Sequence, residues 1–186
     1  MKYVIDTSLF VNPQARKDFG KTPSTAVRKF IKSIEGTDVE LFMPPSIFKE
    51  LTNFVDKKAM DEIELSVKKR APNTYGIYLP AAVMYDFIED MRIRINKGMR
   101  LAEEFARDNR PDNDEKLKKL REKYRTAMRA GILDSKEDLE LVLLAKELEA
   151  TLVSSDEGAM KFADQVGCSW LSAEKFYALL KKKKKS

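Results

Sequence analysis

The chain has 186 residues, a length that suits one compact domain with a small insertion. Apolar residues make up 43% of the chain, which excludes a disordered protein, and charged residues make up 35%, which excludes a membrane protein. No apolar run approaches the ~18 residues that a membrane-spanning helix needs. The first residues lack a secretory signal, so we expect a cytoplasmic protein with no membrane partner.

The residue types that are missing narrow the possible chemistry. The chain contains no histidine, and Cys168 is its only cysteine. Histidine general bases, internal disulfides and zinc sites built from His or Cys are therefore excluded. Any metal must bind to oxygen ligands, which are the ligands that Mg²⁺ and Mn²⁺ prefer.

The net charge of +5 is unevenly distributed. Residues 181–185 are five lysines, and the other 30 Lys and Arg equal the 30 Asp and Glu in number. Between Arg92 and Arg129, however, thirteen basic residues stand against seven acidic ones. Such a basic patch suits a nucleic-acid partner, although a solvated helical surface has the same composition. We expect the lysine-rich tail, residues 181–186, to be solvated and disordered.

Short apolar strands alternate with helices at both ends of the sequence. Near the N-terminus, strands are expected at residues 2–5 and 39–43, a helix from Pro23 to Gly36 with Thr22 as its cap, and a helix at residues 46–55. Near the C-terminus we expect helices at 135–150, 157–165 and 173–180, and strands at 151–154 and 168–171. This alternation predicts an α/β three-layer sandwich around a parallel sheet.

The middle of the chain, residues 56–130, shows no clear strand pattern. Apolar residues spaced by threes and fours predict one long amphipathic helix, with a stripe formed by Met84, Ile88, Met91, Ile95, Met99, Ala102 and Phe105. A turn at residues 110–113 leads to a second helix with a shorter stripe. We expect a helical hairpin inserted in an α/β domain that comprises residues 1–55 and 131–180. Such a hairpin cannot bury its whole stripe on itself, so it covers the α/β core or pairs with another subunit.

Four aspartates stand where a parallel sheet would bring them together. Asp6 and Asp156 each follow a strand, at the edge where open α/β sheets bind ligands. Asp134 and Asp138 lie four residues apart at a helix start, and Asp138 is in phase with core-facing residues. Glu50 borders the apolar face of the helix at 46–55. Carboxylates that converge in this way repel one another unless a cation neutralises them, which favours metal-assisted phosphodiester chemistry.

Each of these acids also has a purely structural explanation. Asp134 would cap its helix with Glu137 reaching back, and Asp138 would interact with the helix dipole. Asp156 would cap the helix that begins at Glu157, and Asp6 would end its strand in an Asx turn. Singly, each structural explanation is at least as good as the catalytic one. A shared metal site explains the acids better as a set.

The motifs Val4-Ile5-Asp6-Thr7-Ser8, residues 44–51 (PPSIFKEL), Asp134…Asp138 and Ser154-Ser155-Asp156 resemble a PIN-domain nuclease in order and spacing. The inserted hairpin and the stretch 134–140 (DSKEDLE) are similar to one branch, the minimal protein-only ribonuclease P family (HARP). This family was once described as an RNA-ligase partner. The resemblance covers nearly the whole chain and implies a PIN-like sandwich. It also implies removal of the 5′ leader from precursor tRNA, a divalent metal, and homo-oligomers formed through the hairpin.

The resemblance assigns roles to individual residues. It makes Asp6, Asp134, Asp138 and Asp156 the catalytic metal ligands, with Glu50 as a further candidate, and it places Ser8 and Ser154 beside them. The metal would be Mg²⁺ or Mn²⁺. The basic hairpin would hold the tRNA backbone. Its candidate contacts are Arg110, Lys116, Lys119, Arg121, Lys123, Arg125 and Arg129.

Two other functions remain open at this stage. A toxin-type PIN ribonuclease would cut mature tRNA or other RNA internally, but the inserted hairpin and the chain length argue against it. A non-catalytic RNA-binding partner of an RNA ligase would need no metal, and the complete set of acids argues against that function.

Overall fold

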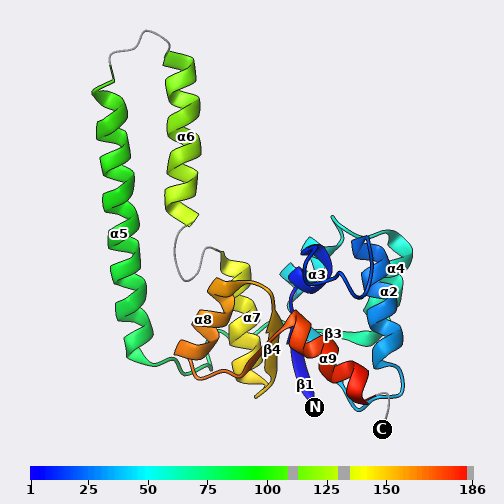
Figure 1. Cartoon of the computed structure of the whole chain (residues 1–186). Helices are drawn as coiled ribbons and strands as arrows, with labels where there is room; N and C mark the ends of the chain where they lie inside the picture. The colour runs from blue at the N-terminus through cyan, green and yellow to red at the C-terminus, as the bar shows by residue number, and fades with distance from the viewer. Residues whose placement is uncertain (109–112, 130–134, 184–186) are drawn as a thin grey trace. The chain divides into compact units, whose positions relative to one another are not determined.

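The computed structural model describes residues 1–108, 113–129 and 135–183 (Figure 1). The chain forms two compact units, one of Met1–Tyr78 with Ser135–Ser186 and one of Leu79–Asp134. The first unit contains the sheet, and the second is the inserted helical hairpin. None of the described helices combines the length and the apolar character that a membrane span requires.

The first unit is built on a five-stranded parallel sheet with the strand order β3-β2-β1-β4-β5. The strands are β1 (Lys2–Ile5), β2 (Glu40–Met43), β3 (Val67–Lys69), β4 (Thr151–Ser154) and β5 (Trp170–Ser172). The helices of this unit are α1 (Ser8–Val11), α2 (Pro23–Ile34), α3 (Pro45–Leu51), α4 (Lys57–Ser66), α7 (Lys136–Glu147), α8 (Glu157–Gln165) and α9 (Ala173–Lys183).

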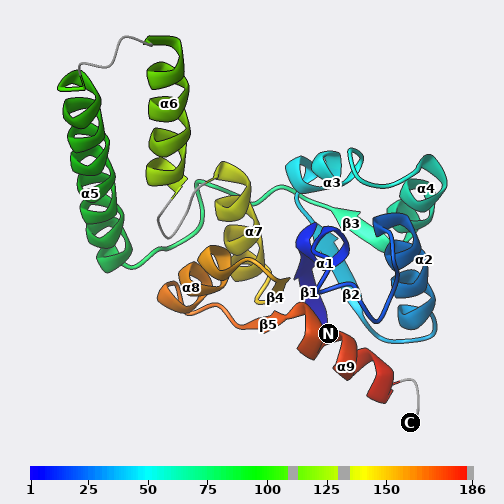
Figure 2. The ribbon, with the colours of Figure 1, turned by 45° about the horizontal axis from the view of Figure 1, so that its top comes forward.

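The direction of the crossovers sorts the helices into two layers. The chain moves from β1 through β2 to β3 in one direction and from β4 to β5 in the other. Because such crossovers are right-handed, α2 and α4 cover one face, and α7 and α8 cover the opposite face. Helix α9 lies beside α2 (Figure 2). The predicted three-layer α/β sandwich is confirmed.

An aromatic cluster under α2 and α9 fixes the short helix α1. The rings of Phe10 and Phe30 lie 5.3 Å apart, and Phe30 also contacts Phe176 and Tyr177. The buried Tyr177 hydroxyl donates a hydrogen bond to the Leu9 carbonyl oxygen at 2.8 Å. The same burial raises the pKa of Tyr177. This packing holds α1, and with it Ser8, at the end of β1.

One strand was not predicted. Residues 56–130 show no clear strand pattern in the sequence, yet residues 67–69 form β3, which pairs in parallel with β2. Helix α4 also packs on α2 in the sheet-containing unit. The boundary to the hairpin therefore lies after Tyr78, not after residue 55 as expected. The apolar pattern of β3 is weak in the sequence, because only Val67 is buried and Lys68 and Lys69 are exposed at the sheet edge.

Other elements differ from expectation mainly at their ends. Helix α3 ends at Leu51 rather than at residue 55, and α7 ends at Glu147, shortly before Glu149 adopts a positive φ of 50°. Strand β5 begins two residues later than expected. Helix α9 continues to Lys183, so the first three tail residues are helical and the expectation of a disordered tail is wrong for them.

The hairpin consists of α5 (Ala81–Ala106) and α6 (Asn113–Arg129), and the expected turn at 110–113 lies mostly outside the described residues. The helices meet at Gly98, where an added Cβ would lie 2.8 Å from Tyr124 Cε2. The buried Arg94 donates a hydrogen bond to the Met128 carbonyl oxygen at 3.2 Å. Most of the predicted stripe lies beside this contact, whereas Phe105 at its end has the Lys123 ammonium group of α6 over its ring, 5.2 Å from the centroid. Within the stripe, Met84, Ile88, Ile95 and Met99 are each at least half exposed.

Candidate active site at the carboxyl edge of the sheet

The two acids predicted from strand ends follow neighbouring strands. Strands β1 and β4 pair in parallel, with Ile5 opposite Val153. Asp6 directly follows β1, and Asp156 lies two residues beyond β4. The chain leaves β1 and β4 in opposite directions, and ligands of open α/β sheets bind at such a point.

The carboxylate of Asp6 is buried and held by hydroxyl groups. Its exposed fraction is 6%. Oδ2 accepts hydrogen bonds from Ser8 Oγ at 2.5 Å and from Ser154 Oγ at 2.6 Å, and Oδ1 accepts one from Thr7 Oγ1 at 3.3 Å. Within the described part of the chain, Asp6 forms no ion pair with Lys or Arg.

Backbone groups after β4 fix those hydroxyls in turn. The Ser155 N–H donates to Ser8 Oγ at 2.8 Å, and the Asp156 N–H donates to Ser154 Oγ at 2.9 Å. Each hydroxyl therefore accepts a hydrogen bond from a backbone N–H after β4 and donates one to the Asp6 carboxylate after β1. The two serines predicted beside the acids do contact Asp6.

Glu50 lies within electrostatic reach of Asp6. Partial burial raises the pKa of Glu50, and the nearby carboxylates of Asp6 and Glu137 raise that pKa further. A hydrogen bond with the Thr7 side chain acts in the opposite direction. Glu137 is an acid that sequence reasoning considered only as part of a helix cap. Its position one residue before Asp138 was the available signal.

Asp138 lies in the first turn of α7, and its side chain is half-buried. Its Oδ2 accepts a hydrogen bond from Ser135 Oγ at 2.6 Å, and its N–H donates to the same hydroxyl at 3.1 Å. Ser135 is thus the N-cap of α7, so the expected capping by Asp134 is wrong. Asp134 lies outside the described part of the chain, so its role as a metal ligand stays a prediction.

Asp156 has a structural role that the sequence also predicted. Its Oδ1 accepts a hydrogen bond from the Ala159 N–H at 2.8 Å and caps α8. One oxygen of this carboxylate is therefore engaged with the helix. The cap fixes the side chain at the carboxyl edge of the sheet.

The donor set fits a hard divalent cation, although it is incomplete in the described residues. Across ranges 1–108, 113–129 and 135–183, no three acidic, Cys or His side chains are close enough to hold a metal by themselves. Asp134 lies in the gap before Ser135. A buried carboxylate that faces like charges and has only hydroxyl partners is nevertheless a site that a cation would stabilise. Every available ligand is an oxygen, as Mg²⁺ and Mn²⁺ require.

The hairpin residues predicted to contact RNA fall into three groups. Lys116, Lys119 and Lys123 are engaged locally, with the Asp108 carbonyl oxygen, Glu115 and Glu104 respectively. Arg121 and Arg125 line an open groove of about 360 Å³ on α6, together with Lys118, which was not predicted. Arg110 and the side chain of Arg129 lie outside the described residues.

Comparison with known proteins identifies the family. A family model described as PINc domain ribonuclease matches residues 2–184. The chain belongs to the PIN-domain ribonucleases. Curated relatives named RNA-free ribonuclease P include proteins of Pyrococcus abyssi (46% identity), Thermococcus onnurineus (47%) and Thermodesulfovibrio yellowstonii (44%). These matches cover 97%, 97% and 94% of this chain and 91%, 94% and 91% of the relatives.

These matches confirm the expected resemblance over nearly the whole chain, including the hairpin. PIN nucleases are endoribonucleases that generally depend on divalent metal ions.

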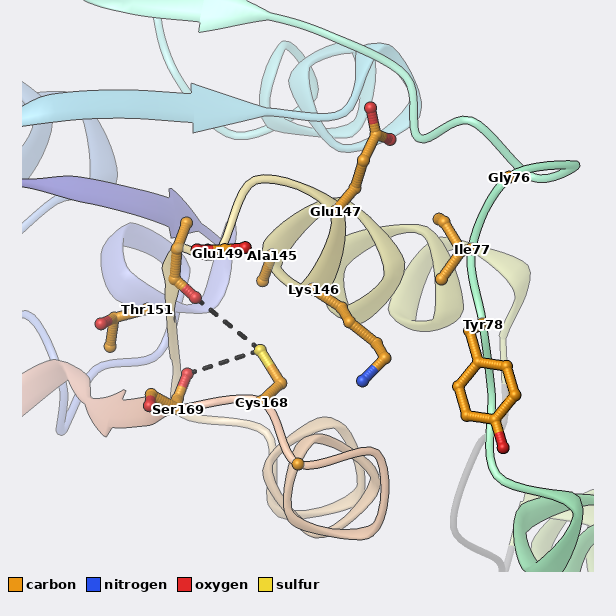
Figure 3. Close-up of a pocket in the computed structure, with 12 residues that line it drawn as sticks. Gly76, Ile77, Tyr78, Ala145, Lys146, Glu147, Glu149, Thr151, Cys168 and Ser169 are labelled. Atoms are coloured by element: carbon orange, nitrogen blue, oxygen red, sulfur yellow. Dashed lines mark hydrogen bonds between the residues drawn. The ribbon is translucent and has the colours of Figure 1, made fainter.

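A hollow of this PIN unit lies at the amino edge of the sheet, opposite the edge that carries Asp6 and Asp156. It has a volume of about 550 Å³ and is lined by the end of α7, the start of β4, the loop before β5 and residues 76–78. Cys168 lies in its wall, with the carbonyl oxygens of Ala150 and Ser169 as its hydrogen-bond partners (Figure 3). Thr151 marks the beginning of β4, whereas the acids gather at its end. This hollow is therefore separate from the candidate active site.

Proposed function

We propose that this chain is an RNA-free ribonuclease P that removes the 5′ leader from precursor tRNA. The carrying observation is the buried Asp6 at the junction of β1 and β4, in a chain that matches proteins of that name over nearly its full length. That the substrate is precursor tRNA is inferred from the ribonuclease P activity for which the relatives are named. The cleavage chemistry is supported by the carboxylates at the sheet edge.

In this proposal Asp6, Asp134, Asp138 and Asp156 hold the metal, and Glu50 completes the acidic border. When bound, Mg²⁺ or Mn²⁺ would lower the pKa of an attacking water and stabilise the departing 3′ oxygen. Ser8 and Ser154 keep the Asp6 carboxylate in one orientation through the hydrogen bonds described above. The products would be a mature tRNA with a 5′-phosphate and a leader with a 3′-hydroxyl.

The hairpin supplies substrate contact and self-association in this proposal. Arg121, Arg125 and Lys118 place three positive charges on a groove that Asp114 and Glu122 also line, and this excess of positive charge suits the phosphate backbone of folded RNA. The exposed apolar stripe of α5 suits a second copy of the same hairpin, because exposed patches of this kind mark protein interfaces. A homo-oligomer would then place several active sites at fixed separations.

A cleavage assay tests this function. A precursor tRNA labelled at its 5′ end is incubated with Mg²⁺ and either the wild-type protein or the Asp138→Asn variant. We expect a single cut at the junction of leader and mature tRNA, and its loss in the variant. Cuts within mature tRNA would favour a toxin-type nuclease, and RNA binding without any cleavage would favour a scaffold. Either result would overturn the proposal.

A further inference from the structure

A polar contact joins α3 and α7, the helices that carry Glu50 and Glu137. Ser46 Oγ of α3 donates a hydrogen bond to Glu140 Oε2 of α7. Glu140 is largely shielded, with 19% of its side chain exposed. Its other oxygen lies 3.4 Å from the exposed Lys136 ammonium group.

This contact lies about one helical turn from an acid on each helix. Glu50 follows Ser46 by four residues on α3, and Glu137 precedes Glu140 by three residues on α7. Helices α3 and α7 contact each other, and each buries an apolar face that includes Ile47 and Leu141. Apolar packing brings the helices together but allows them to slide, whereas a hydrogen bond fixes their register.

The acids on these helices repel one another. Glu50 of α3 experiences the charges of both Asp6 and Glu137, and Glu137 belongs to α7. Repulsion between like charges favours a wider separation of α3 from α7. A hydrogen bond from a hydroxyl to a carboxylate is stronger than a hydrogen bond between neutral groups. The contact between Ser46 and Glu140 therefore opposes that separation.

We propose that Ser46 and Glu140 are a positioning pair that sets the spacing of α3 and α7 and thereby the geometry of the carboxylates around Asp6. The pair touches neither the substrate nor the reacting atoms. This inference rests on the proposed metal-dependent function. Lys136 has no part in it, because an exposed ion pair contributes little.

Mn²⁺ binding to the full-length protein tests this pair without RNA. The protein is freed of metal, and free Mn²⁺ is followed by electron paramagnetic resonance during titration. Ser46→Ala and Glu140→Ala should each weaken binding by about tenfold, as is typical when an outer-shell partner is lost. Glu140→Gln keeps an acceptor oxygen but loses the charge, so its affinity for Mn²⁺ should fall between those of the wild type and Glu140→Ala. Lys136→Ala is the matched control and should bind like the wild type.

Two further measurements separate positioning from general damage. The double variant Ser46→Ala/Glu140→Ala should bind Mn²⁺ no more weakly than either single variant, because both remove the same interaction. In cleavage assays the variants should need more metal for half-maximal rate, with an unchanged KM for precursor tRNA. If Glu140→Ala does not fold, Ser46→Ala carries the test, since it removes one oxygen from a helix that tolerates alanine.

The outcomes distinguish this inference from the proposed function. Variants that match a wild type able to bind Mn²⁺ and cleave precursor tRNA would overturn the pair and leave the function intact. Additive losses in the double variant would overturn it as well. A wild type that binds no Mn²⁺ would overturn both the metal-dependent function and this inference.

Discussion

Ser154 Oγ lies 2.6 Å from Asp6 Oδ2 and joins the carboxyl ends of β4 and β1. Ser154 is fully buried and Asp6 nearly so. The bond crosses 148 residues of sequence, so it exists only once the parallel sheet has formed. Because the hydroxyl also accepts from the Asp156 N–H, the two predicted acids share one hydrogen-bonded anchor.

Asp6→Asn should remove cleavage while leaving the fold intact. The amide keeps the size of the side chain and one acceptor oxygen for the surrounding hydroxyls, but it loses the charge that a cation needs. We expect cleavage of precursor tRNA to fall by more than the roughly 100-fold that outer-shell changes typically cost. Single-turnover kinetics and a thermal unfolding curve measure the two effects. Cleavage at the wild-type rate would exclude Asp6 from the site.

Ser154→Ala should weaken both activity and stability. It leaves the Asp156 N–H without its acceptor and removes a donor from Asp6, and an unsatisfied buried group costs about 1–3 kcal/mol. Urea unfolding measures the stability, and the metal dependence of cleavage measures the site. Ser155→Ala is the matched control, because only the backbone N–H of Ser155 enters this network. Equal behaviour of the two variants would contradict the anchoring role of Ser154.

Much of this site follows from sequence because parallel strands align their carboxyl ends. Asp6 directly follows apolar β1 and Asp156 lies two residues beyond apolar β4, and topology alone then brings them to one edge. Glu137 escaped prediction because it lies on a helix, where its proximity to Glu50 depends on how α3 and α7 pack. The Ser46–Glu140 contact has no sequence signal at all, since it joins residues 94 positions apart.

Periodicity likewise predicted the hairpin but not its contact face. The stripe through Met91 and Ile95 is the more apolar side of α5, yet α6 packs beside Arg94 and Gly98. Glycine permits the close approach, and the arginine is neutralised by Asp90 at 2.5 Å. A helical pattern identifies an apolar face without stating what covers it. Strand β3 was missed for a related reason, because an edge strand buries only one of its three residues.

The exposed stripe yields a prediction about assembly. Met91→Glu/Ile95→Glu should lower the mass measured by light scattering, because it places two charges on the proposed interface. Cleavage should fall by about 100-fold or more if substrate is held by several subunits, while Mn²⁺ binding is retained. Lys97→Glu changes the net charge by the same amount at an exposed position outside the stripe and should keep the wild-type mass. An unchanged mass in the stripe variant would contradict self-association through α5.

The groove on α6 predicts which basic residues hold RNA. Arg121→Ala and Arg125→Ala should each weaken precursor tRNA binding and reduce its dependence on salt concentration by about one unit of the logarithmic slope. Lys119→Ala should have a smaller effect, because Lys119 is already paired with Glu115 at 2.5 Å. Filter binding at several salt concentrations measures these slopes. Equal losses for the three variants would show that the groove is not the preferred contact.

Cys168 gives a pH-dependent test of the hollow at the amino edge of the sheet. Burial raises the pKa of this thiol above its usual value, and the Lys146 charge only partly opposes that shift. The folded protein therefore holds the thiol proton more tightly than the unfolded chain. The contribution of this thiol to the free energy of unfolding is fully present below the unfolded pKa near 9, and it is lost as the pH rises above that value.

The accessibility of Cys168 can be measured by alkylation. At pH 8, iodoacetamide should modify the folded protein at least about tenfold more slowly than the chain in urea. Mass spectrometry measures both rates, and equal rates would mean that Cys168 is accessible in the folded state.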